Sequence, residues 1–408
     1  MLLIIYAFNY ADRYLLAALA EPLKVDLGLN DEFIGLLMGP AFALLFGVFS
    51  IPLARLADRR SRILILSVGC IVWSLFTMAS GFAESGWTLA LMRVGVGIGE
   101  AAFIAPAYSL LSARFPPERR PLAFAILGVG LYAGQAGGYV VGPAIAAVSD
   151  WRMAFIVVGI AGGVVGLIAL LTVAEPRRAV PPMTATGSDT TETLGQVFRY
   201  LWRQPRYVLL NLGIALGTFS GFAFGMWAPS LFVRVHQVPV QEATTVFGTA
   251  FSAAALIGML GFGALSNRLS RRDLRMPLFI AAIATGAATL FIMLATIAPS
   301  MKAVIWLSIP CGLLGGGWSV GVISSLQMIL PDKIRATGMA IFSLLTTLLG
   351  MVLGPYVVGL LSDSLGGDAA GLRTALLIVI SLGFPAAACL WRAAMILDPQ
   401  RIEPLAKP

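Results

Sequence analysis

Twelve long apolar runs constrain this chain more than any other feature of its sequence. Most reach the ~20 residues that a helix needs to cross the ~30 Å hydrocarbon core of a bilayer. Inside that core the chain must satisfy its own backbone hydrogen bonds, so only helices and closed barrels span it. A barrel would show short strands of alternating polarity, which these runs lack. The sequence therefore predicts an all-α membrane protein with twelve transmembrane helices. The expected spans are residues 2–23, 33–56, 63–83, 87–112, 121–148, 153–174, 206–232, 243–266, 276–298, 301–330, 336–361 and 372–397.

Charged residues are few, and their distribution predicts the orientation of the chain. They make up 12% of the sequence, against about 25% in soluble domains. The net charge of +8 could indicate a nucleic-acid partner, but 21 of the 28 Lys and Arg residues fall in the loops after even-numbered spans and at the C-terminus. The positive-inside rule explains this bias without nucleic acid and places both termini in the cytoplasm, in an inner or plasma membrane.

Cysteine and histidine are too scarce to indicate metal or redox chemistry. Cys70, Cys311 and Cys389 lie far apart in apolar runs, and His236 is the only histidine. Structural metal sites and disulfide frameworks need such residues in clusters. We therefore expect no metal and no cofactor, and an enzyme is the least favoured class because no nucleophile–base pair is evident either.

A polar stretch divides the chain into six spans and six spans. Its composition, rich in Pro, Thr and Ser, is typical of a flexible linker, and its end, residues 194–203, is amphipathic and expected to lie at the cytoplasmic interface. The predicted domains are a first bundle at 1–175, a linker at 176–205 and a second bundle at 206–408.

The two halves repeat each other in order. Residues 52–62 (PLARLADRRSR) after the second span match 263–272 (GALSNRLSRR) after the eighth. A Gly-x-x-x-Gly-Pro motif occurs in the fifth span and again in the eleventh. Its residues are Gly138, Gly142 and Pro143, then Gly350, Gly354 and Pro355. Two six-helix bundles related by a parallel repeat suit a transporter with alternating access. Glycine stripes of this kind are close-packing surfaces, and in a rocking transporter we expect them also to be surfaces on which the halves slide.

The fourth apolar run carries two charges, Arg93 and Glu100. A charge near the bilayer centre costs at least ~2.5–3.5 kcal/mol on insertion scales. Seven residues are close to two helical turns, so these two side chains share a face about 10 Å apart along the axis and cannot pair directly. Each needs a partner from elsewhere, either in a structural ion pair or in a proton or substrate site. The intervening glycines do not complete a dinucleotide fingerprint, because Glu100 occupies its last position and no strand precedes it.

Three motifs resemble those of the major facilitator superfamily: the loop motif at 52–62, the run at 93–100 (RVGVGIGE) and the Gly-Pro motif of the fifth span. Within the superfamily, residues 9–14 (NYADRY), 95–101 (GVGIGEA) and 73–74 (WS) resemble the spinster-like family.

The resemblance covers essentially the whole chain and implies that spans 1 and 4 pack side by side around a central cavity. Ala54 and Ser61 stand where the loop motif usually has glycine, which leaves the motif's charges intact and affects only its tightest turn.

This packing would bring Asp12, Arg13, Arg93 and Glu100 into one buried cluster. Both acids reach the bilayer midplane, Asp12 ~17 Å into its span and Glu100 ~20 Å into its own. A low dielectric favours the protonated carboxyl and a nearby Arg favours the charged one, so movement of an Arg would switch an acid between holding and releasing a proton. We expect Asp12 to face the cavity as the primary proton acceptor and Glu100 to couple its charge to Arg13 and Arg93. A permanently paired network is the structural alternative.

Two further sets of residues are predicted from position. Charged groups after spans 2 and 8 are expected to latch the cytoplasmic mouth, with a static topology anchor as the alternative. These residues are Asp58, Arg59, Arg62, Asn267 and Arg268. Aromatic and polar side chains of spans 5, 7 and 10 are candidates for the cavity wall, which we expect to be polar on the first-half side and apolar on the other. These residues are Tyr132, Gln135, Ser220, Phe224, Trp227 and Trp318.

Together these features predict a proton-coupled secondary transporter for a lipid-like or amphipathic substrate, of the sphingoid or lysolipid type that the spinster-like resemblance implies. A broad-specificity proton-driven drug exporter is the alternative, and an uncoupled lipid scramblase or sensor is a different class. The expected partners are the substrate, protons and membrane lipids, and we expect a monomer.

Overall fold

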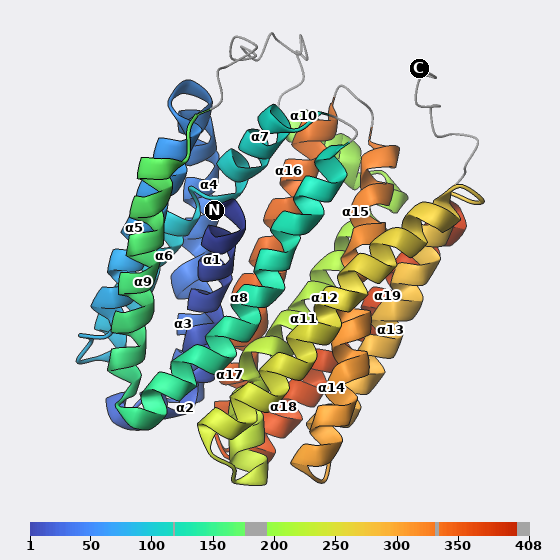
Figure 1. Ribbon diagram of the computed structural model, residues 1–408. Coiled ribbons are helices and arrows are strands. Elements are labelled where there is room, and N and C mark those ends of the chain that lie inside the picture. The colour runs from blue at the N-terminus through green and yellow to red at the C-terminus, as the bar shows by residue number, and fades with distance from the viewer. Residues whose placement is uncertain (117–118, 176–193, 331–333, 398–408) are drawn as a thin grey trace.

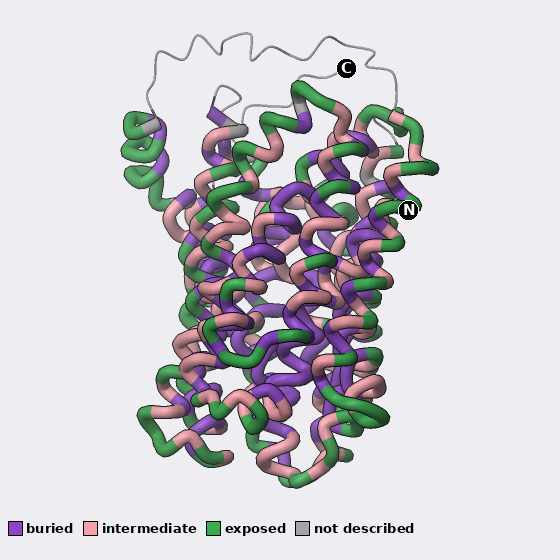
Figure 2. Tube along the Cα trace, turned by 90° about the vertical axis from the view of Figure 1, so that its left-hand side faces the viewer, coloured by how far each residue is buried: buried purple, intermediate pink, exposed green. Residues whose placement is uncertain are grey.

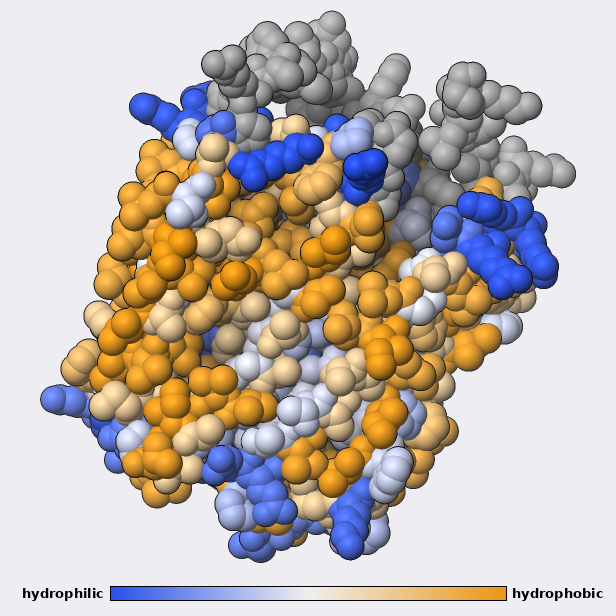
Figure 3. Space-filling model, in the orientation of Figure 1, coloured by the Kyte–Doolittle hydropathy of each residue, from blue (hydrophilic) through white to orange (hydrophobic). Residues whose placement is uncertain are grey.

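The computed structural model describes residues 1–116, 119–175, 194–330 and 334–397, and it is helical along almost all of them. Within these described ranges, eleven helical segments are long and apolar enough to cross a membrane, and a twelfth forms if a bent pair at the N-terminus is one span. Figure 3 shows the wide apolar belt this produces, with hydrophilic side chains gathered at its two ends. The predicted all-α membrane fold is therefore confirmed.

Helices α1 to α9 form what we call the first half. Their bounds are α1 Leu2–Ala18, α2 Ala20–Leu27, α3 Asp31–Met38, α4 Pro40–Arg59, α5 Arg62–Ser80, α6 Gly86–Glu100, α7 Ile104–Arg114, α8 Arg120–Val148 and α9 Trp151–Thr172.

Helices α11 to α19 form the second half. Their bounds are α11 Pro205–His236, α12 Val240–Ser270, α13 Met276–Thr296, α14 Met301–Gly315, α15 Trp318–Ile329, α16 Arg335–Thr346, the π-helix η3 Thr347–Val352, α17 Leu353–Ser364, α18 Ala369–Ser381 and α19 Gly383–Ile396. The short helix α10, Leu194–Trp202, precedes them. The linker predicted before it, residues 176–193, lies outside the described residues.

Several spans expected as single helices are broken. The first bends by 54° between α1 and α2. The second breaks at Gly39, where Pro40 cannot donate a backbone hydrogen bond to continue the helix. The fourth breaks directly after Glu100, so this carboxyl stands at the end of α6. Such interruptions are tolerated at membrane depth where they are buried in protein.

The two halves share their largest apolar core at one end of the molecule, and Val352 of η3 also packs into the core of the first half. The N-terminus and the last turn of α19 lie at the upper end in Figure 1. At the lower end one core joins Leu19 and Ile34 of the first half to Leu231 and Leu376 of the second. Figure 2 shows buried residues concentrated there. Towards the upper end the halves have largely separate cores. The halves are therefore packed together at the lower end.

Helix α8 packs on α1 through a row of glycines. A Cβ added at Gly130, Gly134 or Gly138 would collide with the backbone oxygen of Leu3, Ala7 or Ala11, and one at Gly142 with the Leu15 side chain. These contacts lie within the first half, so the expectation that this stripe slides between the halves is wrong.

The glycine motif of the second half also packs within its own half. Gly354 packs against the backbone of Phe219 inside the second half. Other glycines do approach the opposite half. Gly35 and Gly39 lie next to the backbone oxygens of Pro355 and Val352, Gly359 lies next to that of Asp31, and Gly248 lies against the side chain of Tyr139. The two prolines of the motif lie inside helices, Pro143 in α8 and Pro355 in α17.

We expect Gly138→Ala to lower the melting temperature of the detergent-solubilised protein, because overpacking a close helix contact costs about 1–3 kcal/mol. Gly137→Ala is the matched control: the same change one residue away meets only the Ala11 Cβ at 4.0 Å. It should leave the melting temperature unchanged or slightly higher, since alanine favours helix over glycine. Equal melting temperatures for both variants would contradict the proposed contact.

Candidate functional site

Two ion pairs join α1 to α6 in the interior of the first half. Arg13 binds Glu100 through Nε at 2.8 Å and through Nη2 at 2.6 Å, both to Oε2. Arg93 Nη1 lies 2.7 Å from Asp12 Oδ2. All four residues are 5% exposed or less. As the spacing of Arg93 and Glu100 implied, they do not pair with each other, and each takes its partner from α1.

Neighbouring side chains complete the surroundings of this charge cluster. Thr77 donates a hydrogen bond of 2.5 Å to the second oxygen of Asp12. The Arg13 guanidinium lies over the ring of Phe42 at 4.7 Å and is also close to the rings of Tyr10 and Phe46. Aromatic faces attract cations most strongly where water is excluded. The cluster is therefore neutral in sum, with each ion held by specific contacts.

Some hydrogen-bonding capacity in this region is unused. Glu100 Oε1, Arg93 Nε and both polar atoms of the Asn9 side chain have no partner among the described residues. Asn9 is 1% exposed and lies one helical turn from Asp12 and Arg13. Since buried polar groups are normally satisfied, these two donors and two acceptors leave hydrogen-bonding capacity that a water molecule can fill.

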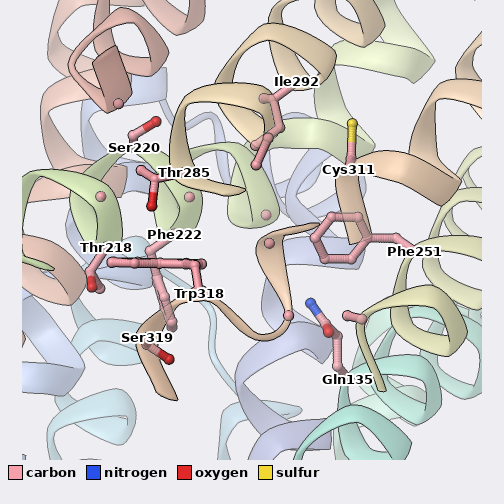
Figure 4. Close-up of a pocket in the computed structure, with 18 of the residues that line it drawn as sticks. Gln135, Thr218, Ser220, Phe222, Phe251, Thr285, Ile292, Cys311, Trp318 and Ser319 are labelled. Carbon is pink, nitrogen blue, oxygen red and sulfur yellow. The ribbon is translucent and has the colours of Figure 1, made fainter. Parts of the chain in front are cut away.

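A cavity of about 250 Å³ lies between the two halves. Of the predicted wall residues, Tyr132, Gln135, Ser220 and Trp318 line it. Figure 4 shows Trp318 across the cavity from Phe251. Tyr132 also donates a hydrogen bond of 2.8 Å to the backbone oxygen of Gly316 in the opposite half.

Phe224 and Trp227, also expected in the wall, are absent from the lining and lie in the lower-end core. Trp227 is fully buried, and its indole N–H donates to the Pro355 oxygen at 2.8 Å. Helix α11 is buried on most of its circumference, so its sequence pattern does not distinguish the cavity face from the core face.

The charge cluster lies behind the cavity wall. Tyr10 and Tyr14 of α1 line the cavity, and Asp12 is about 200° round the helix from either of them. The expectation that Asp12 faces the cavity is therefore wrong. Tyr10, which lies 5.0 Å from the Arg13 guanidinium, separates the two.

The wall is neutral and mixed rather than polar on one side and apolar on the other. The second half contributes most of its hydroxyl groups. They belong to Thr218, Ser220, Thr285, Thr289 and Ser319.

A polar clasp, not anticipated from the sequence, closes the lower end. Arg234 of α11 binds Glu21 at 2.8 Å and Asp31 at 2.7 Å. Asp363 of α17 accepts the backbone N–H groups of Asp31 at 3.1 Å and Glu32 at 2.7 Å. Asp31 additionally accepts from Ser362, and Glu32 from Tyr356. In the sequence these acids stand out only by lying near the ends of predicted spans. Charged residues in solvent-exposed loops have the same position, so the sequence did not distinguish the two.

The residues predicted to latch the opposite mouth are not engaged in a described contact between the halves. Arg59, Asn267 and Arg268 are exposed at the upper end. Arg62 keeps a buried Nε without a partner. The side chain of Asp58 lies outside the described residues.

Comparisons with known proteins agree with this fold. Residues 2–349 match the model of the Major Facilitator Superfamily. The chain is 32% identical to an MFS-type efflux pump of Mycolicibacterium smegmatis, over 97% of this chain and 91% of the pump. It is 29% identical to a sphingosine-1-phosphate transporter of Danio rerio, over 88% of this chain and 74% of that one.

A solved structure is similar as well. The crystal structure of a bacterial homologue of the human lysosomal transporter spinster, inward-facing and unoccupied, superposes with a TM-score of 0.82 at 27% identity. The match covers 97% of this chain and 95% of the homologue.

Double substitutions can test which ions pair. Arg93→Met should destabilise the protein by about 3–5 kcal/mol, because it leaves the Asp12 charge buried and unpaired. Adding Asp12→Asn should recover much of this loss, whereas adding Glu100→Gln should deepen it by also stranding Arg13. Unfolding midpoints in detergent measure the effect. If Asp12→Asn and Glu100→Gln restored stability equally to the Arg93→Met variant, the four ions would not form these two pairs.

Proposed function

Since the chain belongs to the Major Facilitator Superfamily, and is therefore a membrane transporter rather than an enzyme, we propose that it is a proton-coupled secondary transporter for an amphipathic, lipid-like substrate. The observation that carries the proposal is the buried set of two acids and two arginines beside the cavity. A permanently structural network would not need spare acceptor atoms, and this one has them.

Within the cluster, Glu100 is the better placed of the two acids to take the proton first. Both oxygens of Asp12 are already occupied, by Arg93 and by Thr77. Glu100 uses only Oε2 and keeps Oε1 free. The sequence alone favoured Asp12, but a proton there would have to displace an existing hydrogen bond. We assign Asp12 to the second step, in which the pair titrates jointly.

Protonation would change the position of Arg13. Once Glu100 is neutral, the Arg13 guanidinium loses its ionic partner and is held only by the rings around it. Rotation past Tyr10 would bring it to the neutral cavity, where an anionic substrate group could replace Glu100 as its counter-ion. The Arg13 side chain would thereby couple binding of the substrate to protonation of Glu100.

The cavity supports an amphipathic substrate. Its hydroxyl and amide groups can hold a polar head, and its rings and small apolar residues can hold part of a chain. Its volume is below the ~300–1,000 Å³ usual for ligand pockets, so a long chain would extend out of it. The sphingosine-1-phosphate transporter among the relatives supports a sphingoid or lysolipid type.

A broad-specificity proton-driven drug exporter is the second candidate. The absence of charged side chains from the described cavity lining favours neutral or weakly polar drugs. The Mycolicibacterium relative is named an efflux pump, without a stated substrate. An uncoupled scramblase or sensor would need neither acid for its activity.

Alternating access would arise from opening one end of the cavity while the other end is closed. We propose that the upper end is cytoplasmic, as the distribution of Lys and Arg indicates, and that the clasp around Arg234 seals the outer mouth in this state. Opening it while Asp58, Arg59, Arg62, Asn267 and Arg268 close the inner mouth would expose the cavity outside.

Transport into proteoliposomes tests the coupling. We expect a pH gradient to drive accumulation of a lysolipid or sphingoid substrate, and Glu100→Gln and Asp12→Asn to abolish accumulation while leaving downhill exchange measurable. Asp26→Asn, which removes a half-exposed acid at the lower end, is the control and should transport normally. Accumulation by Glu100→Gln at the wild-type level under a pH gradient alone would refute the assignment.

The clasp can be tested with a native reporter. Cys311 lines the cavity, and Cys70→Ser with Cys389→Ser leaves it as the sole thiol. Asp31→Asn should speed its reaction with a membrane-impermeant maleimide added from the outside, because Arg234 loses its main partner. The control Asp26→Asn breaks a pair confined to the first half, with Arg152. Equal labelling rates in both variants would show that the clasp does not hold this end shut.

A further inference from the structure

A second hollow, of about 660 Å³, lies at the upper end of the second half, away from the transport cavity. It is formed where α11 begins and α19 ends. Gln204, Pro205, Arg206, Leu209, Arg392 and Ile396 line it. We call this hollow the arginine pocket. It combines two guanidinium groups from different helices with an apolar floor made by Leu209 and Ile396.

Among the described residues the two arginines have no counter-ion. Neither Arg206 nor Arg392 makes an ion pair or a side-chain hydrogen bond within the described ranges. Two like charges that converge on one hollow repel each other unless an anion lies between them. Guanidinium groups match phosphate oxygens in geometry and bind them through paired N–H donors. The pocket therefore has the chemistry of a phosphate site.

Its surroundings place the arginine pocket at the boundary of the membrane. Val197 and Leu201 anchor α10 on the core of the second half, as Figure 1 shows for α10 near α16. On either flank of this buried pair α10 exposes aromatic rings, and Trp391 beside Arg392 is exposed as well. The rings on α10 are Phe198, Tyr200 and Trp202, which are 43–46% exposed. Exposed aromatics of this kind are typical of the headgroup level of a bilayer.

We propose that the arginine pocket binds an anionic phospholipid of the surrounding leaflet. Its phosphate lies between Arg206 and Arg392, and the first part of an acyl chain lies on Leu209 and Ile396. A basic pocket between transmembrane helices at this level suits a lipid headgroup. The apolar floor favours a phospholipid over a soluble phosphate, because a soluble phosphate has no apolar part to bury there. The bound lipid would tie α19 to the junction of α10 and α11.

Lipid binding to the full-length purified protein tests this inference. Phosphatidylglycerol should raise the melting temperature in detergent by several degrees, and phosphatidylcholine should not. Arg206→Gln and Arg392→Gln should each weaken phosphatidylglycerol binding about fivefold, as expected for ~1 kcal/mol per arginine near an anionic headgroup. Native mass spectrometry provides an independent count of bound lipids.

The matched control is Arg271→Gln with Arg272→Gln, two exposed arginines at the same end and in the same half. This variant should bind lipid like the wild type. Three results would overturn the proposal: equal stabilisation by phosphatidylcholine, an equal effect of inorganic phosphate alone, or unchanged lipid binding in both single variants. Since neither arginine has a partner to lose in the part of the chain that the structure describes, both variants should fold, and their melting temperatures without lipid check this.

Discussion

The need to neutralise charge where water is absent governs the architecture of the first half. Two acids and two arginines meet in the interior of the first half, and each charge would cost several kilocalories per mole if left alone. They satisfy one another across α1 and α6, with Arg13 on Glu100 and Arg93 on Asp12. This arrangement fixes the register of two helices that are far apart in sequence. It also places Tyr10 between the ions and the cavity.

The distribution of close contacts explains how such a molecule can move without unfolding. Within the first half, α8 lies so near α1 that Gly134 and Gly138 contact its backbone, which makes these helices a rigid unit. Between the halves, the shared core and the ionic contacts of Arg234 gather at the lower end. Polar contacts can be exchanged for water at small cost once exposed, whereas interdigitated backbones cannot. The first half is therefore expected to move as a rigid unit, whereas separating the halves must also part the close approach of Gly35 and Gly39 to the backbone of Pro355 and Val352.

The sequence predicted more of the fold than of the site. Spans, repeat and family follow from apolar length and from motifs such as residues 52–62, because the bilayer imposes them locally. That Arg93 and Glu100 need outside partners also follows from helix geometry. The ~100° between Asp12 and Arg13 on a helix also predicts that Arg13 can reach Glu100, as it does. That Asp12 turns to Arg93 and away from the cavity depends on how α1 is rotated, and local sequence carries no signal of that. Trp227 was misplaced because α11 is buried nearly all round. The Arg234–Asp31 contact joins residues 203 positions apart, beyond any periodicity.

The zero net charge of the buried cluster has an electrical consequence. With both acids ionised, the membrane voltage exerts no net force on the cluster, and rocking of the first half is insensitive to voltage as far as these groups are concerned. One added proton makes the cluster singly positive. Displacing that charge across the full field would then be worth about 2.3 kcal/mol per 100 mV. Voltage would therefore act on the protonated cluster only while no anion is bound. A singly charged anionic group at Arg13 would cancel the added charge, so the carrier loaded with proton and anion and the empty, deprotonated carrier would both cross without help from the voltage.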